Sequence, residues 1–160
     1  MTPDNPSGDS PVLIAYDGSD HAKAAIAQAG ELLRTPRAAV VLSVFEPLGG
    51  IPFWGVAYPR VPPNFVEEVQ QQAGKVAEEG AALAREAGFD AEAAVVEGTP
   101  VWQGIIEVAK DRDAGMIVMG SHGRSGISYV AMGSVATAVA HHATAPVLIC
   151  RLANSLGSAR

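Results

Sequence analysis

The chain has 160 residues, of which 48% are hydrophobic and only 6% are aromatic. This length predicts one domain with a substantial core, and the composition excludes a disordered chain. The net charge of −6, with 11 Lys and Arg residues and no basic run, argues against nucleic acid as the main partner. No apolar run could span a membrane, no secretory signal is visible, and the single Cys150 excludes an intrachain disulfide, so the cytoplasm is the expected location.

The first predicted elements are a short strand and a helix. Pro11–Tyr16 is an apolar strand that stops at Asp17-Gly18-Ser19. Ser19 suits the N-cap of the helix that follows, and Thr35-Pro36 ends that helix. Its buried face is expected to contain Ala25, Ile26, Ala29, Leu32 and Leu33.

The next predicted elements are a buried strand, a long loop and a long helix. Ala39–Phe45 is nearly all apolar, which is typical of a parallel strand buried on both faces. Residues 46–63 are rich in Pro and contain Phe53 and Trp54. These two aromatic residues either cover a sheet edge or an oligomer contact, or form a lid over a ligand. From about Pro63 to Ala87, apolar residues recur at steps of three and four, which predicts an amphipathic helix.

The rest of the chain predicts two more helices and three more strands. Strands are expected at Ala91–Glu97, Met116–Met119 and Pro146–Arg151. Thr99 and Pro100 are expected as the N-cap and first residue of one helix, and a second helix is expected over Ser134–His142.

Strands and helices thus alternate, which predicts a single doubly wound α/β domain over residues 11–152, with tails at 1–10 and 153–160. The commonest order of five such strands is 3-2-1-4-5 or its flavodoxin-like relative, with helices on both faces. Ligands in these sheets lie beyond the carboxyl ends of the strands, where the winding reverses. In the order 3-2-1-4-5, Asp17 and Gly120 flank that crevice.

A glycine pattern follows the fourth predicted strand. Gly120 and Gly123 are separated by two residues, and nine residues separate Gly123 from Gly133-Ser134, where a helix is expected to begin. Glycine lets backbone N–H groups approach an anion closely, and a helix N-terminus adds unpaired donors and partial positive charge. The pattern therefore predicts a phosphate site, although the glycines could instead serve only a strand-to-helix turn.

Several side chains near this pattern have two readings. Asp17 would orient a ribose hydroxyl or hold a phosphate-bound Mg²⁺, or it would cap the helix. Arg124 is the only permanent cation in the loop, so backbone N–H groups and a divalent cation would have to help it hold a triphosphate. His122 either donates to a phosphate or faces solvent. Ser121 and Ser134 are hydroxyl donors.

Other residues are expected to be structural. His21 is expected to be exposed, and His141 and His142 suit a helix C-terminus. Trp102 and Cys150 are read as packing. The Walker glycine pattern, the Gly-x-Ser-x-Gly turn and zinc-ligand spacings are absent from the sequence, so no catalytic constellation is predicted.

The sequence Val-Leu-Ile-Ala-Tyr-Asp-Gly-Ser at residues 12–19 and the glycine pattern together resemble the universal stress protein family, in its ATP-binding branch. The resemblance covers Pro11–Arg151 and implies the strand order 3-2-1-4-5. It also implies a homodimer through antiparallel pairing of the last strand, Val147–Arg151. The nucleotide-binding residues that it implies are Ala15, Asp17, Val44, Met119, Gly120, Ser121, His122, Gly123, Arg124, Gly133, Ser134 and Val135.

The expected function is therefore an ATP-binding stress-response module without efficient catalysis, with Mg²⁺ held mainly by the phosphates. Two alternatives remain open. One is a slow ATP-hydrolysing enzyme. The other is a binding module for AMP or a cyclic nucleotide.

Overall fold

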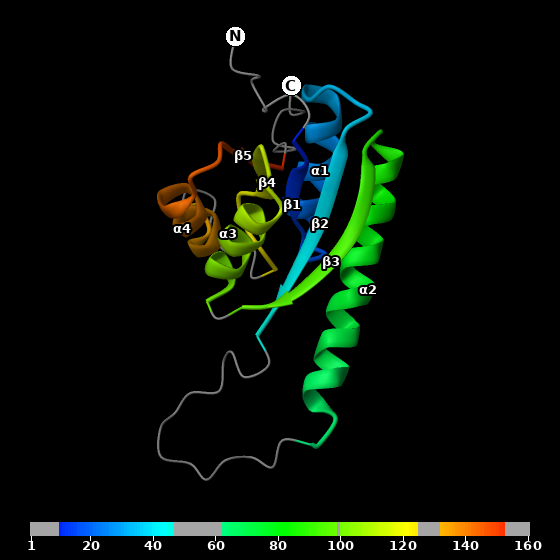
Figure 1. Ribbon diagram of the computed structural model, residues 1–160, viewed down its shortest axis with the longest axis vertical. Coiled ribbons are helices and arrows are strands. Elements are labelled where there is room, and N and C mark those ends of the chain that lie inside the picture. Colours follow the sequence, from blue (N-terminus) through cyan, green and yellow to red (C-terminus); the bar gives the residue numbers. More distant parts are fainter. Residues whose placement is uncertain (1–9, 47–61, 99, 125–131, 153–160) are drawn as a thin grey trace, which may run out of the picture.

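Five parallel strands form one sheet in the order β3-β2-β1-β4-β5 (Figure 1). The computed structural model describes residues 10–46, 62–98, 100–124 and 132–152. The strands are β1 (Val12–Ala15), β2 (Ala38–Phe45), β3 (Asp90–Glu97), β4 (Met116–Gly120) and β5 (Val147–Cys150). The helices are α1 (Asp20–Leu32), α2 (Phe65–Glu86), α3 (Val101–Asp111) and α4 (Ser134–His142). The predicted fold class and strand order are confirmed.

The winding of the sheet reverses at β1, which lies between β2 and β4. Leu13 pairs with Val40 on one side and with Ile117 on the other. Beyond β1, the Tyr16 N–H donates to the Leu42 carbonyl at 2.9 Å, so β1 stays attached to β2 up to the residue before Asp17. This arrangement brings the ends of β1 and β4 to the same edge.

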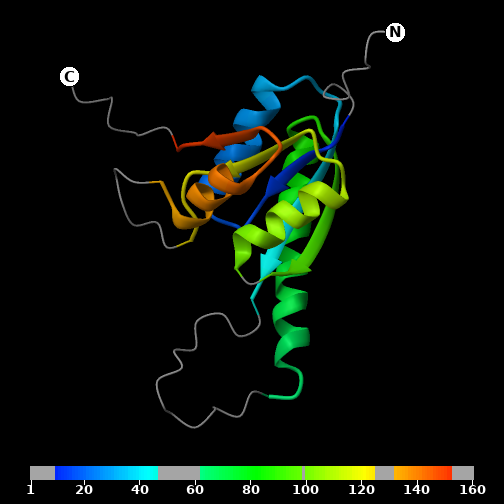
Figure 2. The same ribbon diagram turned by 60° about the vertical axis from the view of Figure 1, so that its left-hand side comes forward.

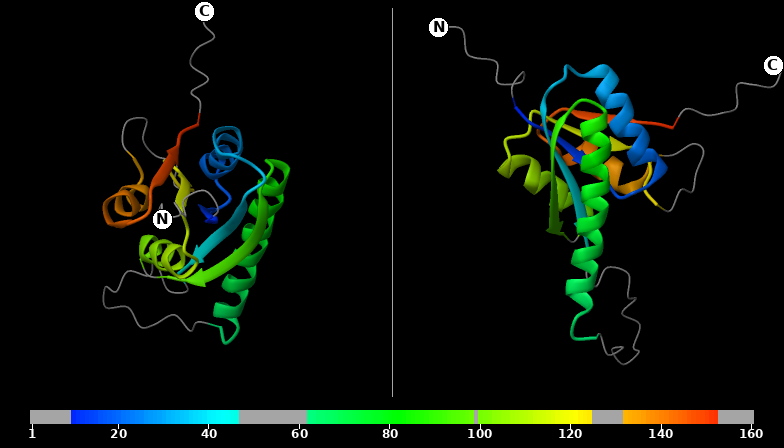
Figure 3. Two further views of the ribbon diagram at one scale, coloured as in Figure 1. Left: turned by 45° about the horizontal axis from the view of Figure 1, so that its top comes forward. Right: turned by 90° about the vertical axis from the view of Figure 1, so that its right-hand side faces the viewer.

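Helices cover both faces of the sheet. α1 and α2 lie on one face and α3 and α4 on the other, as Figure 2 and the left panel of Figure 3 show. Successive residues of a strand point to opposite faces. Accordingly Val12 and Ile14 pack in the cluster with α1 and α2, whereas Leu13 packs in the cluster with α3 and α4. Both faces are apolar because both are covered.

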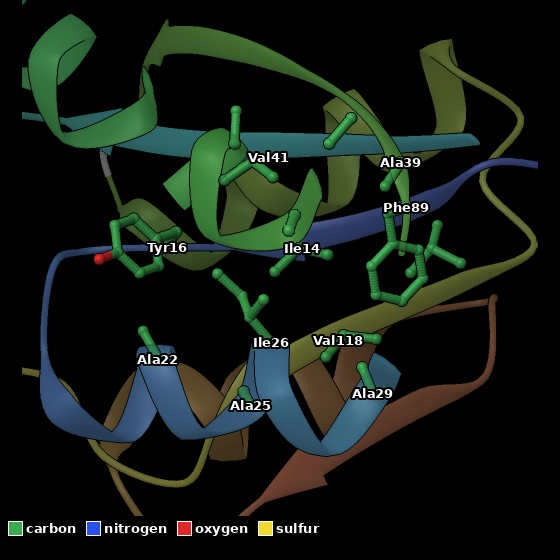
Figure 4. Close-up of a cluster of buried hydrophobic side chains, with 14 of the residues drawn as sticks. Ile14, Tyr16, Ala22, Ala25, Ile26, Ala29, Ala39, Val41, Phe89 and Val118 are labelled. Carbon is green, nitrogen blue, oxygen red and sulfur yellow. The ribbon is translucent and has the colours of Figure 1, made fainter. Parts of the chain in front are cut away.

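Close packing under α2 depends on a glycine. In the first cluster, the Tyr16 ring and Val41 lie beneath the helix (Figure 4). A Cβ built on Gly80 would lie 2.6 Å from Cδ1 of Tyr16 and 2.8 Å from Cγ1 of Val41. Only a residue without a Cβ lets the helix approach this closely.

Two local predictions differ from the structure. Leu32 is 67% exposed, because α1 ends there and the chain turns extended at Leu33, which packs against the core instead. α3 begins at Val101 with Pro100 as its N-cap, and the predicted cap Thr99 lies outside the described residues. The aromatic residues Phe53 and Trp54 of the predicted loop also lie outside them.

Candidate functional site

Asp17 is held in the turn between β1 and α1. Its Oδ1 accepts a hydrogen bond from the Ser19 N–H at 2.9 Å, and Ser19 in turn accepts from the Ala22 N–H at 3.2 Å as the predicted N-cap. The local role of Asp17 is therefore to fix this turn, whereas the capping role that one of its two readings predicts belongs to Ser19. Its second oxygen, Oδ2, lies where the loop after β4 passes.

That loop approaches Asp17 at a glycine. A Cβ built on Gly123 would lie 2.9 Å from Oδ2 of Asp17, closer than real Cβ atoms approach. The next residue, Arg124, donates from Nε to the Asp17 carbonyl oxygen at 2.6 Å. A Cβ built on Gly18 would lie 3.9 Å from Nη2 of Arg124, and the φ of 80° at Gly18 lies in the left-handed region that favours glycine. The ends of β1 and β4 are thus joined by the residues that the glycine pattern singled out.

The second glycine cluster meets the first through Ser121. The Gly133 N–H donates to the Ser121 carbonyl oxygen at 2.7 Å. A Cβ built on Gly133 would lie 3.1 Å from that oxygen and 3.3 Å from Cα of His122. Gly133 is the N-cap of α4, and no side chain among the described residues caps this helix. The N–H groups of the first turn of α4, beginning at the exposed Ser134, therefore lie beside the loop after β4.

His21 is not exposed, contrary to the prediction. It is half-buried in the first turn of α1, and a Cβ built on Gly120 would lie 2.8 Å from its Cβ. The imidazole rings of His21 and His122 lie 5.1 Å apart between centroids. Nδ1 of His122 lies 3.0 Å from Oγ of the buried Ser121, and Nδ1 of His21 lies 3.4 Å from it. Sequence periodicity gives no sign of this contact, because it joins residues 100 positions apart.

The apolar residues among the predicted nucleotide contacts lie in the apolar part of the same edge. Ala15, Val44 and Val135 are partly buried and pack against the cluster beneath α3 and α4, whereas Met119 is buried within it. Gly98 and Gly104, which sequence reasoning missed, allow the approach of Val44. A Cβ built on Gly98 would lie 2.9 Å from Cγ1 of Val44, and a Cβ built on Gly104 would lie 3.2 Å from the same atom.

A second missed interaction lies directly beside Asp17. The Tyr16 hydroxyl donates to Oε1 of Glu79 at 2.7 Å, and Nζ of Lys23 lies 3.3 Å from the same oxygen. Burial, together with the hydrogen bond to Glu79, raises the pKa of Tyr16 well above its ordinary value. The hydrogen bonds from Tyr16 and Lys23 lower the pKa of Glu79. This contact ties α2 to the end of β1.

The remaining histidines and the cysteine agree with their structural readings. His142 is exposed at the end of α4 and stacks on Trp102, with ring centroids 4.6 Å apart. Cys150 is buried, and burial raises the pKa of its thiol. Among the described residues, no group of three or more His, Cys, Asp or Glu residues could hold a metal ion. No helix in the described part of the chain is long and apolar enough to cross a membrane.

Two cavities lie at the opposite, amino-terminal edge of the sheet. One of about 330 Å³ is lined by Pro11, Ala38 and Asp90, among others, and one of about 730 Å³ is lined by residues that include Gly115 and Pro146. Neither contains a residue of the predicted site. In doubly wound sheets ligands bind at the carboxyl edge, so we place the candidate site there and not in these cavities.

Solved structures with the same architecture include nucleotide complexes. The structure of MJ0577 from Methanocaldococcus jannaschii is 22% identical, covers 92% of this chain and 99% of its own, and has a TM-score of 0.73. A universal stress protein from Archaeoglobus fulgidus in complex with dAMP is 23% identical, with a TM-score of 0.60 over 89% of this chain and 98% of its own. A universal stress protein in complex with cAMP is also 23% identical, with a TM-score of 0.60 over 90% and 98%.

Sequence comparison gives relatives of similar length. Universal stress protein YxiE of Bacillus subtilis is 32% identical over 147 residues, covering 88% of this chain and 97% of the relative. A universal stress protein of Thermus aquaticus is 34% identical over 145 residues, with the same coverage. The sequence pattern of the universal stress protein family matches residues 10–151, nearly the whole described domain. The chain therefore belongs to the universal stress protein family.

Proposed function

We propose that this protein is a cytoplasmic stress-response module that binds ATP at the carboxyl edge of its sheet, where β1 and β4 end. The observation that carries the proposal is the approach of both glycine clusters to one edge. Gly123 passes Asp17 without room for a Cβ, and Gly133 donates to Ser121. Relatives with this fold that bind dAMP and cAMP support a nucleotide as the ligand.

The phosphates would lie between the loop after β4 and the start of α4. Backbone N–H groups at Ser134 and Val135, the Ser134 hydroxyl and the partial positive charge of the helix N-terminus would stabilise them. Arg124 would supply one full positive charge and Mg²⁺ another two. Because the described residues offer no carboxylate cluster for a metal, the phosphates would hold the Mg²⁺.

The base would lie against the apolar part of the edge, over Ala15 and Val44, which are both partly exposed. Asp17 lies between this apolar surface and the loop, which suits a contact with ribose hydroxyl groups. The ribose and phosphates would contact Gly120, Ser121 and His122. Met119, which is buried in the core, would pack beneath these three residues.

Calorimetric titration with Mg-ATP tests the proposal. We expect saturable binding in the wild-type protein and its loss in Gly133→Val, whose branched side chain would meet the Ser121 carbonyl. Gly74→Ala is the matched control, because a Cβ at Gly74 has no described neighbour within 4 Å beyond its chain neighbours and its own helix. Absence of saturable heat at millimolar Mg-ATP, in protein free of co-purified nucleotide by native mass spectrometry, would refute the proposal.

A monophosphate is the second candidate ligand, because the two relatives with bound nucleotide hold dAMP and cAMP. It would also need less positive charge, and Arg124 already donates to Asp17. Competition among ATP, AMP and cAMP separates these ligands. ATP should displace the other two; displacement of ATP by a stoichiometric amount of either would reassign the ligand.

Hydrolysis of ATP is the remaining alternative, with bound Mg²⁺ and water as its reactants. We expect a steady-state assay with Mg-ATP to give no turnover above the rate of the Gly133→Val variant. A higher wild-type rate that requires Mg²⁺ would make the protein a slow ATPase.

We further propose a homodimer through β5, which is an edge strand of the sheet. The Pro146 carbonyl accepts from the Ile117 N–H of β4 and the Cys150 carbonyl from the Ser121 N–H just after β4. The backbone groups of Ile149, next to Cys150, therefore face away from the sheet. Ile149→Pro would remove the outward N–H and should give monomers in sedimentation, whereas Ile149→Val should remain dimeric. A monomeric wild-type protein would exclude this interface.

A further inference from the structure

Ser121 is a junction of four segments at the end of β4. It is 1% exposed. Its N–H donates to the Cys150 carbonyl at 2.8 Å, and its own carbonyl accepts from the Gly133 N–H. Its Oγ lies within hydrogen-bonding distance of Nδ1 of both His21 and His122. The side chain therefore links α1 to the loop that carries the glycine pattern.

The single hydroxyl proton of Ser121 restricts the protonation of the two rings. A serine hydroxyl donates one hydrogen bond and accepts two, and a neutral imidazole carries one N–H. When Ser121 donates to Nδ1 of one ring, the other ring must donate its own Nδ1–H to Oγ. The two neutral rings are therefore opposite tautomers: one carries its proton at Nε2, and the other has an unprotonated Nε2. A further proton at Nε2 of the second ring leaves the hydrogen bonds to Oγ unchanged and gives both rings an N–H at Nε2.

The pair lies where an anion would alter that balance. His122 directly precedes Gly123, and Ser121 holds the N-cap of α4. Both rings are partly exposed. A negative charge nearby favours protonated imidazole, and the ordinary pKa of histidine, about 6.5, is close to physiological pH.

The other charged groups on the surrounding elements have described partners or lie on exposed side chains. Arg124 donates to the Asp17 carbonyl, and Lys23 contacts Glu79 on α2. Asp20 and Arg151 are exposed at the start of α1 and after β5.

We propose that His21, Ser121 and His122 form a proton-linked phosphate subsite, in which binding of the nucleotide phosphate is accompanied by uptake of a proton by the histidine pair. The inference rests on the proposed nucleotide binding and adds His21 to the site. One linked proton whose pKa rises by one unit strengthens binding about tenfold between high and low pH. The nucleotide for this measurement is cAMP, whose phosphodiester does not titrate in this range.

Calorimetry in two buffers of different ionisation enthalpy counts the protons taken up. At pH 7 we expect uptake of a substantial fraction of one proton per cAMP, and affinity about sixfold higher at pH 6 than at pH 8, below the tenfold limit. His21→Asn keeps a polar group near Oγ but does not titrate, so it should still bind cAMP with less proton uptake and a flatter pH dependence. His141→Asn, which changes an exposed histidine at the far end of α4, should behave as wild type.

The outcomes separate the inference from the function on which it rests. Binding of cAMP without proton uptake, or identical uptake in His21→Asn and wild type, would overturn the linked subsite and leave nucleotide binding intact. Absence of binding by any nucleotide would overturn both. ¹⁵N resonances of the histidines in the free protein at pH 8 give a second test: opposite tautomers for His21 and His122 are expected, and the same tautomer in both would contradict the link through Ser121.

Discussion

Gly80 and Gly74 lie in the same helix but differ in what surrounds them, so alanine substitutions there measure the packing of α2 on the sheet. A Cβ at Gly80 would lie 2.6 Å and 2.7 Å from the Tyr16 ring and 2.8 Å from Val41. A Cβ at Gly74 has no described atom within 4 Å beyond its chain neighbours and its own helix. Both changes favour the helix by about 0.8–1.0 kcal/mol. Only Gly80→Ala adds an overpacking cost of about 1–3 kcal/mol.

Gly74→Ala should therefore raise the free energy of unfolding by nearly 1 kcal/mol, since little besides helix propensity changes. Gly80→Ala should lie about 1–3 kcal/mol below it. Each 1 kcal/mol shifts the melting temperature of a domain of this size by about 2–4 °C. Thermal unfolding followed by circular dichroism, with urea unfolding as a second measure, gives both values. If the two variants are equally stabilised, the close contact between Gly80 and Tyr16 does not exist.

Four further predictions concern single side chains. Ile26→Ala should lower the free energy of unfolding by about 2–5 kcal/mol, because Ile26 is 1% exposed. Leu32→Ala on the same helix should lower it by under about 0.5 kcal/mol, because Leu32 is exposed. Equal losses in urea unfolding would contradict this difference in burial. Tyr16 has a raised pKa in the folded state, so its contribution to stability is present below about pH 10 and is lost above it; Tyr16→Phe should flatten this alkaline limb of a stability–pH curve. Glu79 has a lowered pKa, so its contribution is present above its ordinary value and is lost as pH falls below it; Glu79→Gln should flatten the acid limb, and an unchanged limb would exclude its role. The Cys150 thiol should react with a thiol reagent only after unfolding, and rapid reaction of the native protein would show that it is accessible.

Local patterns in the sequence were sufficient to predict the elements, whereas the order of the strands was narrowed to two possibilities and chosen between them by the family resemblance. The alternation of apolar runs with amphipathic segments fixes the α/β class, and the Ser19 cap and the α4 range agree with the structure. Leu32 was predicted wrongly because periodicity continues a helix face until the pattern stops, whereas the backbone leaves the helix at Leu33.

The contacts that assemble the candidate site could be predicted only in part. The meeting of Asp17 with the glycine loop follows from topology, since both come after neighbouring strands. The contact of Tyr16 with Glu79 and that of His21 with Ser121 join residues 63 and 100 positions apart. Side-chain directions decide such contacts, and no spacing in one sequence encodes them. The roles of the predicted nucleotide-binding residues stay predictions until the titrations above are made.

Where β1 pairs with β4, the sheet joins two parts that come from separate stretches of the chain. Three strands come from residues 12–97 and two from residues 116–150, and the seam between them is the pairing of Val12–Ile14 with Met116–Val118. A ligand that touches both Asp17 and the start of α4 would act as a staple across this seam, because neither part could open without releasing it. At a concentration of 100 Kd it would add about 2.7 kcal/mol to the unfolding free energy. Amide hydrogen exchange at Ile14 and Val118, in the core, should then be slower when the ligand is bound.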